Sequence, residues 1–409
     1  MPPAPPLNIT IIGGGIAGLF AARVLREKHN VTVLEKSSGG NEVGAAVTPG
    51  PNATKCLYKY GWNPQKCGAL SLSKVRTLDH KGALVQEQDV SGIKELFGSD
   101  WHVVHRLDLW NELLRLATTS SEDLGLVGQP VKIFWRVDVV KVDIESGDVS
   151  LADGTIISAD LVIGADGIKS TIRPLVVPEA GQPIASGASM FRFILPRNVV
   201  NQVSPDVLLG DPTSGTELNI SIASDGSGRS VVTYPCRNLE LLNVGCIAPD
   251  PLINVPISDS WSAPGTREDL LRVFGDFHLR PILEQAENIK LWQLRDNDPL
   301  PNYFKGRTLL IGDAAHAMTP HQGQGASQAI EDGEAMVLFV DEPVTRDTVK
   351  SVLRDFDRVR RIRATKLQAI TRSVHDAKNP EMMWKNQHYN FTYDGVRDCL
   401  AKLDAGKDI

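Results

Sequence analysis

Residues 7–35, LNITIIGGGIAGLFAARVLREKHNVTVLE, decide how this chain folds. The apolar run at 7–12 is typical of a buried strand, the residues at 16–28 have helical spacing, and the run at 31–34 is typical of a second strand. Three glycines stand between the first strand and the helix in G-x-G-x-x-G spacing: Gly13, Gly15 and Gly18. This order of elements predicts a β–α–β unit that binds a dinucleotide.

Each part of that unit has a physical role. Gly13 permits a tight turn, Gly15 lets the backbone approach a diphosphate, and Gly18 lets the helix pack on the strand. The diphosphate would lie at the helix N-terminus, where backbone N–H groups are free. Glu35 ends the second strand near the position from which an acid binds a ribose hydroxyl. Its charge would repel a 2′-phosphate, which indicates FAD or NAD rather than NADP at this site.

A second candidate site lies at residues 308–333, TLLIGDAAHAMTPHQGQGASQAIEDG. A short apolar run predicts a buried strand, and Asp313 stands where that strand would end. A glycine-rich turn at 320–325 then leads into a helical pattern. The start of such a helix would stabilise negative charge on a ring system such as a reduced flavin. The alternative is an ordinary strand–turn–helix connection.

Two weaker features follow from the same reasoning. The segment 164–173, GADGIKSTIR, places Asp166 and Gly167 after a third apolar strand. Asp–Gly alone indicates only a turn. The segment becomes a candidate site because two other candidate sites in this chain also stand at the end of an apolar strand. The segment 105–117, HRLDLWNELLRLA, predicts an amphipathic helix near whose start Arg106 stands. A surface ion pair with Asp108 or Glu112 is an equally good interpretation of Arg106.

The middle of the chain, at 178–283, changes to short β-prone runs between turn residues, which predicts an antiparallel sheet. On one of these strands Arg192 shares a face with Met190 and Ile194, so it requires either a partner or an opening to solvent or ligand. Tyr234 is interpreted as a core, rim or site residue. Beyond it, 344–374 predicts one long helix, whose basic run RVRRIR at 358–363 is interpreted as a solvated face.

Composition excludes several classes of protein. The chain has 409 residues, enough for two or three packed units, and a net charge of -6, which gives no reason to expect a nucleic-acid partner. No apolar run reaches the roughly 18 residues of a membrane-spanning helix. The start, MPPAPP, lacks the pattern of a signal peptide, so we expect a cytoplasmic protein. The five cysteines have no metal-ligand or disulfide spacing, so we expect no metal and free thiols in a reducing compartment.

The three strand-end segments together resemble the single-component (group A) FAD-dependent aromatic hydroxylases, which include salicylate hydroxylase, and fungal members most nearly. GGGIAG with Glu35 resembles the FAD adenosine site, and GADGIKSTIR is similar to the motif in which Asp166 would serve FAD and NAD(P)H. GDAAHAMTPHQGQGASQAIEDG is similar to the motif in which Asp313 would bind the ribityl chain. Arg106 matches the arginine that contacts FAD in the family.

The resemblance also implies roles for residues that spacing alone does not assign. Further cofactor contacts would come from a larger set: Lys36, Gly44, Ala45, Ala46, Gly323, Gln324, Gly325 and Ala326. Arg192, within MFRF, matches an arginine that binds the substrate phenolate or carboxylate in some members. Tyr234 and His321 are further candidates for the catalytic site. Asn297 departs from the family pattern, in which arginine is frequent at this position.

The expected fold is therefore α/β: a dinucleotide-binding (Rossmann-like) FAD domain with an inserted antiparallel β-sheet substrate domain and C-terminal helices. The FAD domain is expected in three parts, 1–75, 101–178 and 286–343. The substrate domain is expected at 76–100 and 179–285, and the C-terminal helical region at 344–409.

The resemblance implies a monooxygenase of secondary metabolism, a monomer or homodimer, that consumes NADPH or NADH and dioxygen. It would hydroxylate a small phenolic or salicylate-like substrate through a flavin 4a-hydroperoxide. Epoxidation or Baeyer–Villiger oxidation on the same fold is an alternative, because substrate shape decides between them. An oxidase that needs no NAD(P)H, or a non-catalytic FAD-fold escort protein, would be alternatives of other classes.

Overall fold

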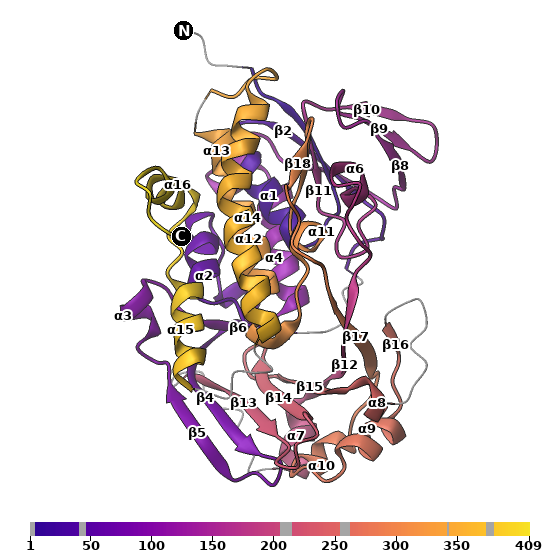
Figure 1. The fold of residues 1–409 in the computed structure, drawn as a ribbon, viewed down its shortest axis with the longest axis vertical. Coiled ribbons are helices and arrows are strands. Elements are labelled where there is room, and N and C mark those ends of the chain that lie inside the picture. The colour runs from indigo at the N-terminus through magenta and orange to yellow at the C-terminus, as the bar shows by residue number, and fades with distance from the viewer. Residues whose placement is uncertain (1–4, 41–45, 205–214, 254–261, 342, 374–379) are drawn as a thin grey trace.

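The computed structural model describes residues 5–40, 46–204, 215–253, 262–341, 343–373 and 380–409. Two residues expected at the cofactor, Gly44 and Ala45, lie outside these ranges. The described part has two sheet-containing halves, and long helices of the upper half reach toward the lower sheet (Figure 1).

The upper half contains the predicted nucleotide-binding sheet, in the order β18-β19-β11-β1-β2-β7. Its strands are β1 (Asn8–Ile12), β2 (Asn30–Glu35), β7 (Lys132–Trp135), β11 (Leu161–Gly164), β18 (Phe304–Lys305) and β19 (Thr308–Leu310). All pairs are parallel except β18–β19. Ile12 pairs with Gly164, which pairs with Leu310, so the three candidate segments leave the sheet at one edge. In open parallel sheets this carboxyl edge is where ligands bind.

Helices cover this sheet because its strands are apolar on both faces. They include α1 (Ile16–Leu25), α2 (Pro51–Lys59), α4 (Arg106–Thr118), α12 (Gly325–Ala335), α13 (Val337–Val340) and α14 (Val349–Ser373). Gly50 caps α2, although Asn52, a residue type that often caps helices, stands two positions later. Asn52 is buried inside the first turn, where its amide donates to Glu331 and Gln324.

The lower half is a sheet in the order β16-β17-β12-β15-β14-β13-β4-β6-β3, with β5 paired to β4. Its strands are β3 (Ala46–Val47), β4 (Leu70–Asp79), β5 (Leu84–Asp89), β6 (His102–His105), β12 (Ile184–Pro196), β13 (Thr216–Ile222), β14 (Ser230–Cys236), β15 (Leu241–Pro249), β16 (Ser262–Pro264) and β17 (Lys290–Asp296). Its pairs are antiparallel except β13–β4, which is parallel, because two distant chain segments meet there. The boundary expected at 76 falls inside β4.

The two faces of the lower sheet have different environments. On β12, Phe191, Phe193 and Leu195 are buried in a core with residues of several helices, which include α7 (Arg197–Val203), α9 (Arg267–Phe274) and α10 (Arg280–Leu283). The alternate residues Met190 and Arg192 are only half-buried, as the two-residue period of a strand requires. The helices therefore cover one face and leave the other to line a site.

Smaller elements complete the described chain. A separate three-stranded meander contains β8 (Val139–Val142), β9 (Asp148–Leu151) and β10 (Ile156–Ser158). The short helices are α3 (Ile93–Phe97), α5 (Ser121–Leu124), α6 (Arg173–Val176), α8 (Asp250–Ile253) and α11 (Asp313–His316), with single 3-10 turns η1 (Gln65–Cys67) and η2 (Pro320–Gln322). No helix in the described ranges combines the length and apolar character needed to cross a membrane.

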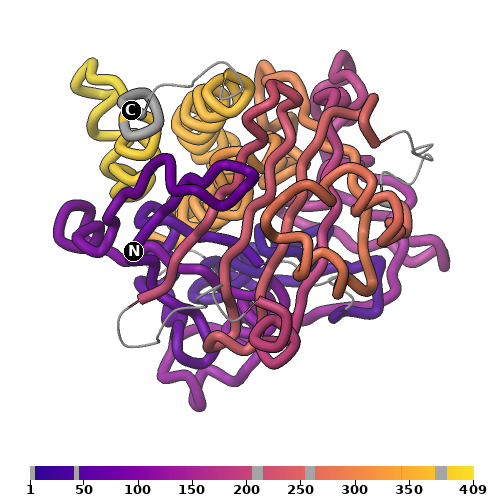
Figure 2. The backbone as a smooth tube through the Cα atoms, turned by 90° about the horizontal axis from the view of Figure 1, so that it is seen from below, coloured from indigo at the N-terminus to yellow at the C-terminus, as the bar shows by residue number. Residues whose placement is uncertain are grey.

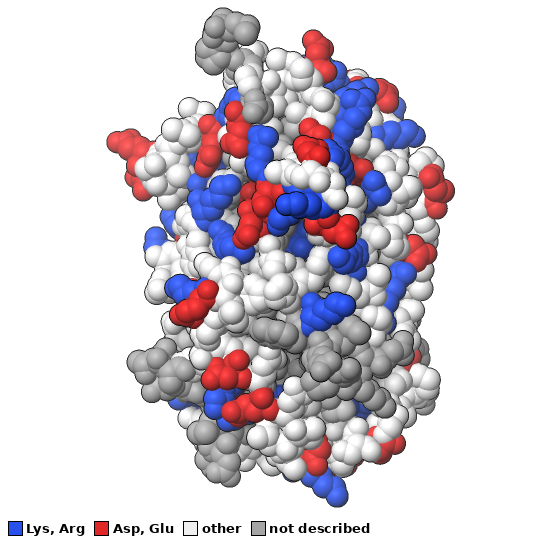
Figure 3. All heavy atoms as spheres, turned by 60° about the vertical axis from the view of Figure 1, so that its left-hand side comes forward, with Lys and Arg blue, Asp and Glu red and all other residues white. Residues whose placement is uncertain are grey.

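The C-terminal helices α15 (Pro380–Phe391) and α16 (Val396–Asp404) dock on the body. Phe391 and Tyr393 are buried, and the Phe391 ring lies edge-on to Phe97 of α3. In Figure 2 the yellow C-terminal segment lies beside violet backbone from the first hundred residues. Basic and acidic side chains lie next to one another on the face in Figure 3. On α16, Lys402 pairs with Asp398.

The interpretation of the basic run at 358–363 as a solvated face is wrong for two of its arginines. Arg360 and Arg363 of α14 are buried, with only 0% and 2% of their surface exposed. Glu331 and Asp332 of α12 are their partners. A buried charge requires such a partner, and here it comes from a helix that the local sequence does not identify.

Candidate active site and cofactor site

The glycine loop after β1 has the geometry that its spacing predicts. A Cβ on Gly13, whose φ is +108°, would stand 2.3 Å from the Ala165 carbonyl oxygen. A Cβ on Gly18 would stand 2.0 Å from the carbonyl oxygen of Gly13. Gly15, the N-cap of α1, differs because its Cβ would meet no heavy atom of the described residues within 4 Å. Gly13 and Gly18 therefore serve packing, whereas Gly15 leaves an open approach to the helix N-terminus.

Glu35 lies beside this loop at the end of β2. Its Oε2 accepts a hydrogen bond from the Gly14 N–H at 2.7 Å, and its Oε1 accepts one from the Ser37 N–H at 2.7 Å. These bonds fix the carboxylate next to the glycine turn. Lys36 is placed differently, because its side chain is 85% exposed and its Nζ lies 3.5 Å from Asp138.

Asp166 reaches the same loop from the end of β11. Its Oδ2 accepts hydrogen bonds from Thr171 N at 2.7 Å, Thr171 Oγ1 at 3.2 Å and Ile172 N at 3.3 Å. Its Oδ1 is buried, and no hydrogen-bond partner for it lies within the described ranges. A buried acceptor of this kind is stabilised by a ligand that brings a hydroxyl or N–H group.

Asp313 and Arg106 form the next part of the site. Asp313 is exposed at the start of α11, directly after Gly312, whose φ is +58°. Burial lowers the pKa of Arg106 to about 10, while Asp313 raises it and Arg192 lowers it further. The three side chains therefore share one electrostatic environment. The acids of the alternative interpretation have other partners, since Arg237 binds Asp108 and Arg115 binds Glu112.

The glycine-rich segment before α12 lies at the same edge. Gly323 has a φ of +63°, and a Cβ there would stand 2.7 Å from Thr48 Oγ1. Gln324 is buried and accepts a hydrogen bond from Asn52 at 3.1 Å. At Gly325, the first residue of α12, a Cβ would meet no heavy atom of the described chain within 4 Å, and Ala326 beside it is half-buried. His321, in η2, is half-buried as well.

The lower sheet meets this edge at β3. Arg192 Nη2 and the Tyr234 hydroxyl each donate a hydrogen bond of 2.8 Å to the carbonyl oxygen of Ala46. The N–H of Ala46 donates to Asn243 Oδ1 at 3.2 Å. Burial raises the pKa of Tyr234 to about 12, against the opposing effect of Arg192, so Tyr234 is a neutral donor near pH 7.

Sequence reasoning missed Asn243 and the partners of Asp332. The available signal for Asn243 was an amide on a strand, β15, whose neighbours are apolar. Asn297, the departure from the family pattern, is buried, and its backbone carbonyl accepts hydrogen bonds from Gln368 and Arg372.

A surface pocket of about 470 Å³ lies elsewhere, between α2 and β6, and Tyr58, Lys94 and His102 are among the residues that line it. None of the residues expected at the site lines that pocket.

Comparison with known proteins identifies the family. Residues 138–371, more than half of the chain, match the FAD binding domain family, and residues 11–63 match the NAD(P)-binding Rossmann-like domain. Hispidin-3-hydroxylase of Neonothopanus nambi is 32% identical over 386 residues, which are 92% of this chain and 90% of that protein. The FAD-dependent monooxygenase cfoG of Aspergillus candidus is 32% identical over 415 residues, which are 96% and 94% of the two chains.

The chain belongs to the FAD-dependent aromatic hydroxylase family. A salicylate hydroxylase–substrate complex is 25% identical, with a TM-score of 0.72 over 98% of this chain and 94% of the other. The chain is thus a flavoprotein monooxygenase. Two features of its own structure fit FAD: the open approach at Gly15 suits a diphosphate, and the buried Oδ1 of Asp166 suits a donor on the cofactor.

Proposed function

We propose that this hydroxylase uses NADH or NADPH to hydroxylate a phenolic substrate that binds as an anion beside Arg192. The observation that carries the proposal is the convergence of Arg192 and Tyr234 on the Ala46 carbonyl, in the electrostatic environment of Arg106 and Asp313. This places a cation and a neutral donor at the junction of the cofactor half and the substrate sheet.

Arg192 is oriented for this role. The Ala46 carbonyl accepts from only one of the five N–H groups that a guanidinium carries, so the bond orients the group without exhausting its donors. A cation within about 4–6 Å of a phenol lowers the phenol pKa and favours the phenolate. The phenolate ring is richer in electrons than the phenol ring, and it is therefore the better acceptor of an electrophilic oxygen atom.

The rest of this sheet face suits an aromatic ring. Met190 and Ile194 flank Arg192 on β12, and Val232 lies across the sheet on β14; all three are half-buried. Gly245 of β15 pairs with both Arg192 and Val232, so a position without a side chain lies between them. An apolar surface with one cation favours a substrate that has an aromatic body and one anionic oxygen. It also excludes water from the reacting atoms.

We assign the FAD-binding roles as follows. Gly15 and the start of α1 would take the diphosphate, Glu35 the adenosine ribose, and Asp313 the ribityl hydroxyls. The backbone N–H groups at 323–326 would face the pyrimidine end of the flavin, Asp166 would serve FAD and NAD(P)H, and Arg106 would contact the flavin from α4. Bound FAD supplies the redox chemistry, in which NAD(P)H provides electrons and dioxygen provides the transferred atom.

The first test follows NADH and NADPH oxidation, dioxygen and peroxide, with and without a panel of salicylates and alkylated resorcinols. Oxidation that a phenol stimulates, with little peroxide released, is the expected result. Oxidation of neither nucleotide by the FAD-bound protein would overturn the proposal and favour an oxidase or a binding protein.

The second test compares Arg192→Ala and Arg192→Lys with Arg229→Ala, a control at an ion pair with Asp276 just before β14. Loss of a charge-assisted hydrogen bond of about 1.5–3 kcal/mol raises KM for the phenol by about 10- to 150-fold in Arg192→Ala. Lysine restores part of the effect, and FAD affinity stays unchanged. Normal KM and coupling in Arg192→Ala would refute the assignment.

A further inference from the structure

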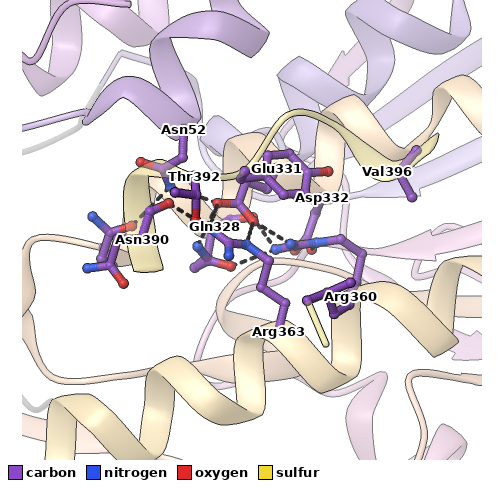
Figure 4. A network of polar contacts seen from close by, with 12 residues as sticks. Asn52, Gln328, Glu331, Asp332, Arg360, Arg363, Asn390, Thr392 and Val396 are labelled. Atoms are coloured by element: carbon purple, nitrogen blue, oxygen red, sulfur yellow. Dashed lines mark hydrogen bonds and ion pairs between the residues drawn. The ribbon is translucent and has the colours of Figure 1, made fainter. Parts of the chain in front are cut away.

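A network of buried charges joins α12, which begins at the flavin-facing segment, to α14. Glu331 and Asp332 of α12 and Arg360 and Arg363 of α14 are at most 2% exposed. Figure 4 shows the two arginines pointing from α14 toward the two carboxylates. Arg360 binds both acids, and Arg363 binds Glu331. Two buried arginines thus face two buried carboxylates.

Asp332 is the member of this network that reaches the cofactor edge. Its Oδ2 accepts hydrogen bonds from the backbone N–H of Gly312 and from His316 Nε2, each at 2.7 Å. Its Oδ1 accepts from Arg360 Nε at 2.7 Å. Gly312 caps α11, whose first residue is Asp313 and whose last is His316. One carboxylate therefore fixes both ends of the short turn that presents Asp313.

This carboxylate remains ionised despite its burial. Burial opposes ionisation, but the charges of His316 and Arg360 outweigh that effect and hold the pKa of Asp332 at about 2. An anionic acceptor forms shorter and stronger hydrogen bonds than a neutral one, and a low dielectric strengthens them.

The turn needs such a constraint. Gly312 has φ +58° and ψ -144°, and a Cβ there would stand 2.8 Å from the Cβ of Ala17 in α1. The backbone is thus in a conformation that L side chains rarely adopt, packed against the helix that follows the glycine loop. Asp313 comes next and is exposed, so its placement depends on the backbone that precedes it.

We propose that Asp332 is a positioning residue for FAD: through Gly312 and His316 it sets the place of Asp313 relative to Arg106. The proposal rests on the assignment of Asp313 to the cofactor. Asp332 has 0% of its surface exposed and binds Gly312 and His316 at the two ends of the turn, so it acts on the cofactor through that turn.

The chain offers a matched control on the same helix. Glu334 is 3% exposed, and its Oε2 accepts hydrogen bonds from the backbone N–H of Val396 at 2.9 Å and from the Tyr393 hydroxyl at 2.8 Å. It is thus also a buried acid that binds a distant backbone N–H, but the segment it binds is the C-terminal one. Asp332→Asn and Glu334→Gln are both isosteric and both remove one buried negative charge.

The experiment measures FAD affinity of the apoproteins by fluorescence titration, together with the urea midpoint and the visible circular dichroism of the bound flavin. Asp332→Asn should weaken FAD binding about tenfold or more, equivalent to ~1.4 kcal/mol, and change the flavin dichroism. Glu334→Gln should lower the urea midpoint while leaving FAD affinity within about twofold, because altered stability alone does not change the affinity of the folded protein.

Two further variants keep the test decisive if Asp332→Asn does not fold. His316→Ala removes one of the three hydrogen bonds of Asp332, whereas His316→Gln can restore a donor. Weaker FAD binding in the alanine variant with recovery in the glutamine variant supports the proposal. Equal FAD affinity in His316→Ala and the wild type would overturn it.

An Asp313→Ala variant separates failure of this inference from failure of the assignment beneath it. If Asp313→Ala weakens FAD binding and Asp332→Asn does not, the positioning role is refuted and the assignment of Asp313 stands. If Asp313→Ala leaves FAD affinity unchanged, the assignment itself fails. Equal losses of FAD affinity in Asp332→Asn and Glu334→Gln would reduce Asp332 to a general structural role.

Discussion

Replacing Gly15 by alanine should weaken FAD binding without unfolding the protein. Gly15 has φ -74° and ψ -174°, an extended conformation open to any residue, and within the described part of the chain its Cβ would meet no heavy atom within 4 Å. Loss of backbone freedom in the unfolded chain stabilises the variant by about 0.4–1 kcal/mol. Alanine is a poorer N-cap than glycine, which costs a similar amount. The free energy of unfolding of the apoprotein should therefore change by less than about 0.5 kcal/mol.

The same methyl group occupies the space through which a diphosphate reaches the helix N-terminus. Overpacking by one methyl group in a close contact costs about 1–3 kcal/mol, which corresponds to about 5- to 150-fold weaker binding. The Gly15→Ala variant therefore changes FAD affinity without a matching change in the free energy of unfolding.

Gly18→Ala is the matched comparison. Its Cβ would stand 2.0 Å from the Gly13 carbonyl oxygen and 3.3 Å from Ile11 Cγ2, so α1 has to move away from β1. The free energy of unfolding of the apoprotein should fall by about 1–3 kcal/mol or more.

The assay is urea unfolding of each apoprotein, followed by FAD titration under conditions where every variant is folded. The reasoning is refuted if Gly15→Ala binds FAD like the wild type, or if it destabilises the apoprotein as much as Gly18→Ala does. The first result would move the diphosphate away from this helix, and the second would mean that the open approach is absent in solution.

Three other predictions follow from the buried polar groups. Tyr234→Phe, which loses one neutral hydrogen bond of about 1 kcal/mol to the Ala46 carbonyl, should lower the free energy of unfolding by about that amount at unchanged FAD affinity; an unchanged urea midpoint would contradict this. Because the pKa of Asp332 is lowered from 3.8 to about 2, its contribution to stability, about 2 kcal/mol, is present above pH 4 and lost as the pH falls toward 2. Urea midpoints of Asp332→Asn should therefore fall less steeply with acid than those of the wild type, and parallel curves would refute this. Arg363→Ala should lower the free energy of unfolding by about 3–5 kcal/mol, because buried Glu331 loses one of its arginine partners. The surface variant Arg358→Ala should lower it by less than about 1 kcal/mol, as urea unfolding will measure.

Much of the upper half could be predicted because its information is local. The apolar runs and glycine spacing at 7–35 predicted β1, α1 and β2, and the structure confirms them with end differences of a few residues. Gly13 and Gly18 pack as that spacing requires. Local patterns suffice here because each glycine contacts a backbone segment of its own unit or of the neighbouring strand.

The errors came from residues whose partners are distant in the chain. Asparagine is a common helix cap, but Gly50 caps α2, and Asn52 binds Glu331 instead. β4 pairs in parallel with β13, a strand more than a hundred residues later, which period-two patterns do not encode. The roles of Arg192, Asp166 and Asp313 toward ligands remain proposals.

The sequence by itself determined the nucleotide-binding unit, the order of the three strand-end segments and the family of the protein. Only the tertiary structure decided which charges are buried and what they bind. Arg360 and Arg363 form an exposed-looking basic run in the chain, yet they are buried against Glu331 and Asp332. The physical reason is that helical and strand periods report which face of an element is apolar. A buried charge is stabilised only by its partner, and the fold alone brings that partner near.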